Sequence, residues 1–163
     1  AVSPLKFKEA SFLLKSRLRE KTRTHNIAIP RDIGFARWEE ELPPKEKLTD
    51  LFQSLEAVER VSTIALDSRV SRIEEITVTE LQNSFLGETI SYRKRIITID
   101  VFGDYASVIA YIRNLYKDDF FFVISRCVMS KRQVSDPRSD NGGESVENGG
   151  IVLSRFEIEQ ILV

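Results

Sequence analysis

Apolar residues recur at helical spacing in three stretches of the chain, and this pattern predicts three helices. The clearest stripe follows Pro44 with the spacing i, i+3, i+4, i+7 and i+10, and consists of Leu48, Leu51, Phe52, Leu55 and Val58. We expect this helix to continue through "VERVSTIAL" and to end before Arg72.

The other two helices have recognisable start signals. An N-terminal helix is predicted from Ser3 and Pro4, because a hydroxyl N-cap followed by proline at the first helical position favours a helix start. It should reach about Thr24, with an apolar side made of Leu5, Phe12, Leu13, Leu14 and Leu18. A later helix should begin after the N-cap Asp104 and end at residues 118–119, with the stripe Tyr105, Val108, Ile109, Ile112 and Leu115.

Four further stretches alternate between apolar and polar residues or are rich in β-branched and aromatic side chains, which predicts strands. They are residues 72–81, 90–102, 120–130 and 150–163, with a turn over 83–88 after the first. The side chains expected to share one buried face are Ile97, Ile99 and Val101 in the second strand, and Phe156, Ile158 and Leu162 in the fourth.

The order of elements after residue 44 is helix, strand, strand, helix, strand, strand, which is one αββ unit used twice. Two such units predict an α+β fold, a ferredoxin-like sandwich in permuted order (αββ-αββ), with a four-stranded antiparallel sheet and two helices on one face. An N-terminal helix precedes it, and the alternating strands predict that the other sheet face is more polar.

We divide the chain into an N-terminal helix and connector, 1–43, and a ferredoxin-like domain, 44–163. Within that domain, residues 132–150 contain two Asn-Gly-Gly triplets and almost no apolar side chain. Such a segment buries too little surface to offset the entropy of ordering it, so we predict a mobile loop.

The connector and the first helix carry opposite charge. Pro30, Gly34 and Pro43-Pro44 punctuate the connector, which leaves room for one short helical turn near Trp38. Residues 1–26 have an excess of about five positive charges, and residues 32–59 an excess of about five negative charges. Either the two segments pack together, within one chain or between two copies, or they are separate solvated faces; the sequence leaves both open.

Composition narrows the class of protein. The 163 residues, 42% of them hydrophobic, suit a single domain with a sizeable core. Charged residues make up 30% and balance to a net charge of −1, which argues against a protein that coats nucleic acid. Cys127 and His25 are each the only residue of their type, so a disulfide within the chain is impossible. A zinc cluster or a Cys–His catalytic pair would need these two residues to meet.

No apolar run is long enough to span a bilayer, and no signal-peptide pattern is present. Because the chain begins at Ala1 rather than at methionine, we expect a processing site or chain boundary there, and an upstream membrane anchor is compatible with the sequence.

Gly103 lies between a predicted strand and a predicted helix, the position of a phosphate-binding turn. Such a turn needs several glycines and a helix N-terminus free of negative charge. Here one glycine is followed by Asp104, whose carboxylate is itself a helix cap. We therefore interpret this turn as structural.

Two other segments allow a binding role beside a structural one. The aromatic run 120–122 can form a stacking platform for single-stranded RNA, but its flanks are acidic and apolar rather than basic, so core packing is favoured. The basic cluster 91–95 suits an anionic partner, and equally a solvated strand beside the acidic residues Glu74, Glu75 and Glu80.

The acidic run 37–42 is best explained as charged surface, since consecutive carboxylates do not converge on one point. Trp38 within it either anchors a neighbouring protein or covers its own domain. The loop 140–150 lacks the ligand spacing of a calcium site. The sequence thus provides no catalytic, cofactor-binding or metal-ligating residue.

Several segments together resemble the PilO-like family, the periplasmic parts of the inner-membrane platform of type IV pilus assembly. They are a basic helix leading into "HNIAIP", the amphipathic "LTDLFQSLEAVERV" before a strand, and "IITIDVFGDYASVIAYIRNLYKDDFFFVISRCVMS" before a last long strand. The likeness covers nearly the whole chain, and the GspM-type component of type II secretion shares the architecture.

The resemblance implies a non-enzymatic, periplasmic assembly protein without cofactors. It also implies a cytoplasmic tail, a membrane helix and a coiled coil upstream, so that the membrane is reached only through an anchor missing here. The implied partners are proteins, either a second copy in a homodimer or a PilN-like sister of similar fold, and not nucleic acid. The alternative functions are, in order, a ferredoxin-like small-molecule-binding regulatory module, an RNA binder and an enzyme.

Overall fold

A computed structural model describes the chain except for residues 1–2, 89, 121, 132–149 and 163. Its helices are α1 (Pro4–His25), α2 (Arg37–Glu40), a 3-10 turn η1 (Lys45–Lys47), α3 (Leu48–Asp67) and α4 (Tyr105–Lys117). Its strands are β1 (Arg72–Val78), β2 (Gln82–Leu86), β3 (Ile90–Gly103), β4 (Phe122–Lys131) and β5 (Val152–Leu162). The mobile loop expected at 132–150 lies, except for Gly150, outside the described residues.

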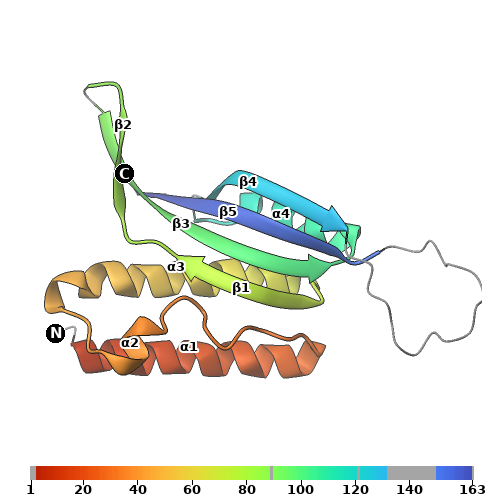
Figure 1. Cartoon of the computed structure of the whole chain (residues 1–163), viewed down its shortest axis with the longest axis horizontal. Coiled ribbons are helices and arrows are strands. Elements are labelled where there is room, and N and C mark those ends of the chain that lie inside the picture. Colours follow the sequence, from red (N-terminus) through yellow and green to blue (C-terminus); the bar gives the residue numbers. More distant parts are fainter. Residues whose placement is uncertain (1–2, 89, 121, 132–149, 163) are drawn as a thin grey trace, which may run out of the picture.

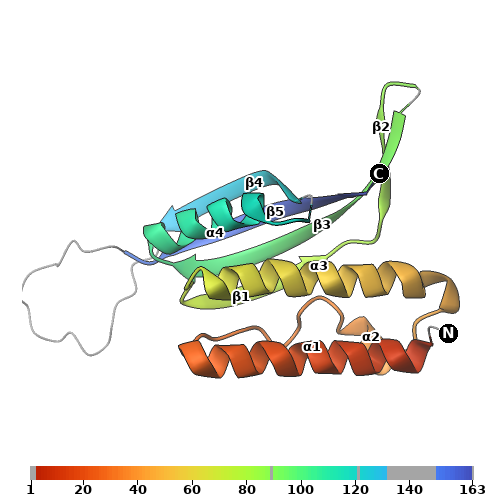
Figure 2. The ribbon, with the colours of Figure 1, turned by 180° about the vertical axis from the view of Figure 1, so that it is seen from behind.

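The helices gather on one side of an antiparallel sheet. Figure 1 and Figure 2 show α1, α3 and α4 side by side, with α3 in the middle. The sheet order is β1-β3-β5-β4, so α3-β1-β3 and α4-β4-β5 are two αββ units whose second strands pair at the centre. The expected α+β sandwich of ferredoxin-like type in permuted order is confirmed.

The sheet has a fifth strand, which corrects the expected count of four. Residues 82–86 form β2, although the turn was predicted over 83–88, and they pair with the start of β3 from Gln82↔Lys94 to Leu86↔Ile90. The turn itself is shorter and includes Gly87 at φ +71°. The polar sequence of β2 does not alternate, and its strand form comes from hydrogen bonding to β3. The hairpin of β2 and the start of β3 projects from the body as an arm (Figure 1).

The stripe predicted for α3 is the one that packs against the core. Leu48, Leu51, Leu55 and Val58 are buried and Phe52 is half-buried. On the facing sheet surface Ile97, Ile99 and Val101 are fully buried, as are Phe156 and Ile158 of β5. The strand faces predicted at these positions are therefore confirmed.

The apolar side predicted for α1 was partly wrong. Leu5, Phe12 and Leu13 are 69%, 67% and 47% exposed, and the buried row is instead Phe7, Ser11, Leu14, Leu18 and Thr22. Phe7 sets this orientation, since its ring meets Phe35 and Phe52 edge-on at centroid distances of 6.0 and 5.5 Å. One aromatic cluster outweighs the burial of three apolar side chains elsewhere on the helix.

The stripe predicted for α4 merged two different rows. Val108, Tyr111 and Leu115 are buried, whereas Tyr105 is 63% exposed. The predicted stripe left out Tyr111, whose hydroxyl is satisfied by donating to the Val61 carbonyl at 3.1 Å. Its ring packs edge-on against Phe156 at 5.2 Å, and burial raises the pKa of the phenol well above its usual value.

The connector between α1 and α3 covers one edge of the sheet. The amide of Ile73 in β1 donates to the carbonyl of Ala28 at 2.9 Å, and the two segments form a parallel bridge there. Gly34 has φ +104°, and a Cβ at this position would lie 3.2 Å from Val78 Cγ1. A side chain at residue 34 would therefore be strained in conformation and crowded against β1.

Ion pairs join the basic first helix to the acidic segment of the same chain. Lys15 pairs with Glu39, and Arg17 pairs with Glu59 at 3.0 Å. Of the two open interpretations of the opposite charges, packing within one chain is the one observed. The sheet face without helices is polar, as predicted; there Arg155 donates to both oxygens of Asp100 at 2.8 and 2.7 Å.

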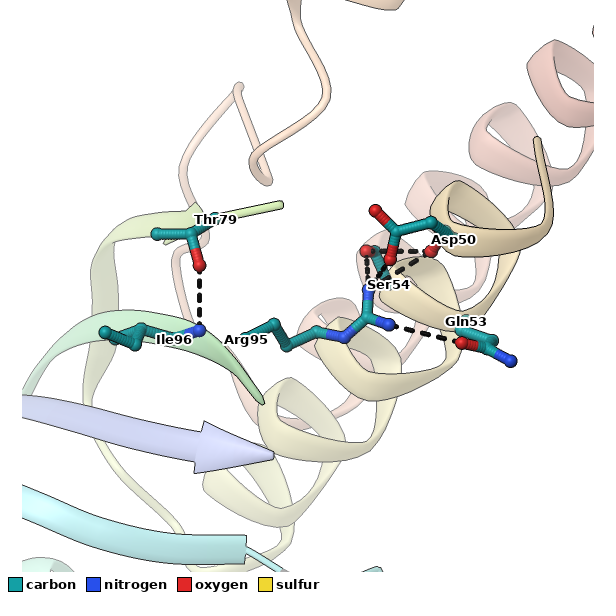
Figure 3. A network of polar contacts seen from close by, with 6 residues as sticks. All are labelled: Asp50, Gln53, Ser54, Thr79, Arg95 and Ile96. Carbon is teal, nitrogen blue, oxygen red and sulfur yellow. Dashed lines mark hydrogen bonds and ion pairs between the residues drawn. The ribbon is translucent and has the colours of Figure 1, made fainter. Parts of the chain in front are cut away.

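A buried guanidinium fastens the start of α3 to β3 near the base of the arm (Figure 3). Arg95 is fully buried, and its Nη1 pairs with Asp50 Oδ1 at 2.9 Å and donates to the Asp50 carbonyl at 3.1 Å. Ser54 Oγ and Gln53 Oε1 also accept from the guanidinium. Burial lowers the pKa of Arg95, while the Asp50 carboxylate opposes that effect.

Replacing Asp50 by alanine should test this network. The variant Asp50→Ala leaves a buried cation without its counter-ion, so we expect the free energy of unfolding to fall by about 3 kcal/mol. Arg95→Met removes the charge and keeps an unbranched apolar side chain, so it should destabilise less. Denaturant unfolding of both variants measures the difference, and an Asp50→Ala variant more stable than Arg95→Met would contradict the account.

The N-cap of α4 gives a second prediction. The amide of Ser107 donates to Asp104 Oδ1 at 2.7 Å, and this bonding lowers the pKa of Asp104. Asp104→Ala should lower the free energy of unfolding by about 1 kcal/mol at pH 7, and Asp104→Asn by much less because asparagine also caps.

Because the folded-state pKa is depressed, the charge-dependent stabilisation is present above about pH 3.9, the usual value for aspartate, and is lost as the pH falls through the lowered pKa. Stability curves of wild type and Asp104→Asn should therefore converge below that pH. Parallel curves would rule out this contribution.

Candidate functional site

The turn at Gly103 is a structural joint, as predicted. Gly103 ends β3 opposite Val152, and a Cβ there would make only ordinary contacts of 3.5 Å with Val70 and Ser107. Asp104 occupies the start of α4 with its carboxylate bonded to the helix amide of Ser107. The negative charge stands where a phosphate would have to bind.

The aromatic candidates pack inward. Phe122 is buried and stacks on Phe120 with ring centroids 5.4 Å apart, and Arg60 lies over Phe120 at 5.7 Å. This is the core packing that the sequence favoured; Phe121 lies outside the described residues. Trp38 is also buried, beneath Arg37 at 4.6 Å, so it covers its own domain.

The basic cluster 91–95 is largely satisfied within the chain. Lys94 donates to Glu159 at 3.0 Å, and Arg95 is buried against Asp50. The acidic neighbours expected for the cluster were wrong, because β1 pairs with a later part of β3. Glu74, Glu75 and Glu80 instead meet Arg72, Arg155 and Lys47. These contacts explain most of the cluster as structure.

The residues with possible metal or redox chemistry do not converge. Among the described residues, no group of three or more His, Cys, Asp or Glu side chains is placed to hold a metal ion. Glu39 and Glu41 of the acidic run pair with Lys15 and Arg37. Cys127 is exposed on β4, where partial burial raises the pKa of its thiol and so disfavours the reactive thiolate.

Two of the surface hollows are lined by residues that are already paired with each other. A hollow of about 420 Å³ between α1 and α3 includes Arg17 and Glu59, which form an ion pair. Another of about 350 Å³ beneath α2 includes Lys15 and Glu39, which do the same. Such hollows offer no set of converging, available polar groups for a small molecule.

Exposed apolar side chains on helices and strands are the more distinctive feature. They lie on α1, on β2 in the arm, on α4 and on β4: Leu5, Phe12, Leu13, Phe85, Leu86, Tyr105, Tyr116, Val123, Val128 and Met129. The connector covers the edge at β1, but within the described residues no strand pairs with the outer edge of β4. The candidate site is therefore this outer surface, and it suits protein contacts.

Sequence reasoning placed Leu5, Phe12, Leu13 and Tyr105 on the apolar stripes of helices and did not identify them as contact residues. One sequence signal was available: α4 contains more apolar residues than a single buried row can account for, so some of them must lie on another face. The arm had no such signal, because its strand was read as a turn.

Comparisons with known proteins rest on structure. No family model matches the chain, and the search of curated proteins finds no similar sequence. A core domain from Akkermansia muciniphila aligns over 98% of this chain and 87% of its own length, with 14% identity and a TM-score of 0.75. An A. muciniphila protein determined without its transmembrane region aligns over 98% and 84%, with 13% identity and a TM-score of 0.77.

The type 4 fimbrial biogenesis protein PilO from Pseudomonas aeruginosa aligns over 88% of this chain and 96% of its own, with 10% identity and a TM-score of 0.46. The identities limit these comparisons to the fold. This chain therefore shares its fold with the A. muciniphila structures over nearly all of its length.

Proposed function

We propose that this chain is the periplasmic part of a non-catalytic assembly protein in the inner-membrane platform of a type IV pilus or type II secretion machine. The observation that carries the proposal is the set of exposed apolar side chains on helices and strands, together with the sheet edge at β4 that no described strand covers. Proteins that assemble with others expose such patches, whereas hollows with converging polar groups mark ligand sites. The sequence resemblance gives the class of machine.

The proposal includes an anchor upstream of residue 1. Within the part of the chain that the structure describes, none of the helices has the length and apolar content that a bilayer span requires. One structural neighbour was determined without its transmembrane region, which supports a similar arrangement here. In this arrangement residues 1–43 connect the anchor to the ferredoxin-like domain, 44–163.

The chain acts by binding a second copy of itself or a PilN-like sister protein of similar fold. The arm with Phe85 and Leu86 and the α4–β4 side of the body are separate surfaces, so one chain can engage two neighbours at once. A platform protein needs two binding surfaces, because it must link several components and not only form a single pair.

Chemical crosslinking in membranes of the source cells tests the proposal. The full-length protein should crosslink to itself or to a second protein of similar fold. In whole cells it should become accessible to protease only after the outer membrane is permeabilised. Deleting the gene should abolish surface filaments or secretion. A protein found in the soluble cytoplasmic fraction, with no crosslinked protein partner, would contradict it.

A further inference from the structure

Helix α4 carries a second apolar row besides the one it buries. The row is Tyr105, Ile109, Ile112 and Tyr116, spaced by 4, 3 and 4 residues along one helix face. The two tyrosines are 63% and 60% exposed, and the two isoleucines are half-buried. Tyrosine is enriched at protein interfaces because it combines a large apolar ring with a polar end.

This row points away from α3. On the α3 side of the helix, Ser107 Oγ donates to the Arg69 carbonyl and Asn114 donates to Ser68 Oγ, both at 3.1 Å. The buried row faces the sheet. A helix turns 100° per residue, so the exposed row lies opposite the α3 contacts, toward the edge strand β4. Figure 2 shows α4 with α3 on one side and β4 at the far edge of the sheet.

Strand β4 adds apolar side chains to the same side. Cys127 and Met129 are paired with Phe156 and Ser154, which are buried beneath the helices. Residues directly opposite each other share a sheet face, so Cys127 and Met129 point toward the helix layer. Both are exposed, and none of the described helices covers them. The six side chains form what we call the α4–β4 step: Tyr105, Ile109, Ile112, Tyr116, Cys127 and Met129.

The row on α4 is complementary to itself. Read in either direction it is Tyr, Ile, Ile, Tyr with the same spacing. Two copies of α4 placed antiparallel about a two-fold axis therefore bring each tyrosine to the partner's other tyrosine and each isoleucine to the partner's other isoleucine. An interface around a two-fold axis requires this self-complementarity.

The charges at the two helix ends agree with the same arrangement. The N-terminal end carries Asp104, and the C-terminal half carries Arg113 and Lys117. At the C-terminal end Asp118 is held by Arg60 at 2.6 Å, so the cations outweigh the remaining carboxylate of Asp119. In the antiparallel pair each Asp104 faces the partner's cationic end, and the helix dipoles oppose.

We propose that the α4–β4 step binds a second copy of this chain, through antiparallel packing of α4 against its symmetry mate. This deepens the proposed function, on which it rests, by assigning the surface of the homodimer. We assign the contact to side chains rather than to strand addition, because the irregularity between Ile124 and Arg126 shortens the regular edge that β4 offers to a further strand.

Sedimentation equilibrium of the purified chain tests the inference. The wild type should dimerise, and Tyr105→Ser/Tyr116→Ser should weaken the dimer at least tenfold in Kd, as expected when interface tyrosines are truncated. Leu5→Ser/Phe12→Ser is the matched control, since these α1 residues are as exposed as the tyrosines and lie outside the step. Its Kd should stay unchanged, and circular dichroism should show both variants folded.

Disulfide trapping tests the antiparallel arrangement of the two α4 helices. In a Cys127→Ser background, Ile109→Cys lies near the proposed axis and should form a covalent dimer under mild oxidation, while the exposed Ser16→Cys on α1 should not. A tyrosine variant that dimerises like the wild type, or trapping at Ser16→Cys alone, would overturn the inference. A monomeric wild type would also overturn it, and crosslinking to a sister protein in membranes would then leave the proposed function standing.

Discussion

The body of the protein depends on the burial of one face of β3 beneath α3 and α4. Ile97, Ile99 and Val101 are fully buried there, and full burial of each such side chain contributes about 1.5–3 kcal/mol. Because β3 is the second strand of the first αββ unit and pairs with β5, the second strand of the other unit, this face joins the two units. The remaining elements are arranged around that contact.

The same packing determines which surfaces stay open. Helix α3 takes the side of the sheet nearest β1, and α1 with the connector covers α3 and the β1 edge. Among the described residues, α4 has no helix on the side away from α3, and no strand pairs with the outer edge of β4. The sheet is therefore asymmetric: the chain's own connector bridges to its β1 edge, while no described strand pairs with its β4 edge.

Periodicity predicted the elements well and their faces less well. The αββ repeat, the α3 stripe and the Asp104 cap were predictable because they depend on the spacing and capping chemistry of residues close together in the sequence. The faces of α1 and α4 depended on partners distant in sequence. Phe7 points inward because it packs against Phe35 and Phe52. Tyr111 can be buried because its hydroxyl donates a hydrogen bond to the Val61 carbonyl.

Arg95 illustrates why some positions resist prediction from sequence. Its position in a basic cluster predicts an exposed side chain, yet Arg95 is the largest fully buried side chain among the described residues. Its burial is possible only because Asp50, Gln53 and Ser54 stand on one face of α3 and satisfy most of the guanidinium. Likewise β2 forms a strand only because the start of β3 extends beyond the part paired with β1 and pairs with β2 instead.

In the function proposed here, the protein acts through the α4–β4 side of its body rather than through a cleft. This can be checked by hydroxyl-radical footprinting of the wild-type chain at concentrations below and above self-association. Tyr105, Tyr116 and Met129 should lose reactivity on association, while Phe12 on α1 should keep its own. Protection of Phe12 with unchanged reactivity on α4 and β4 would contradict it.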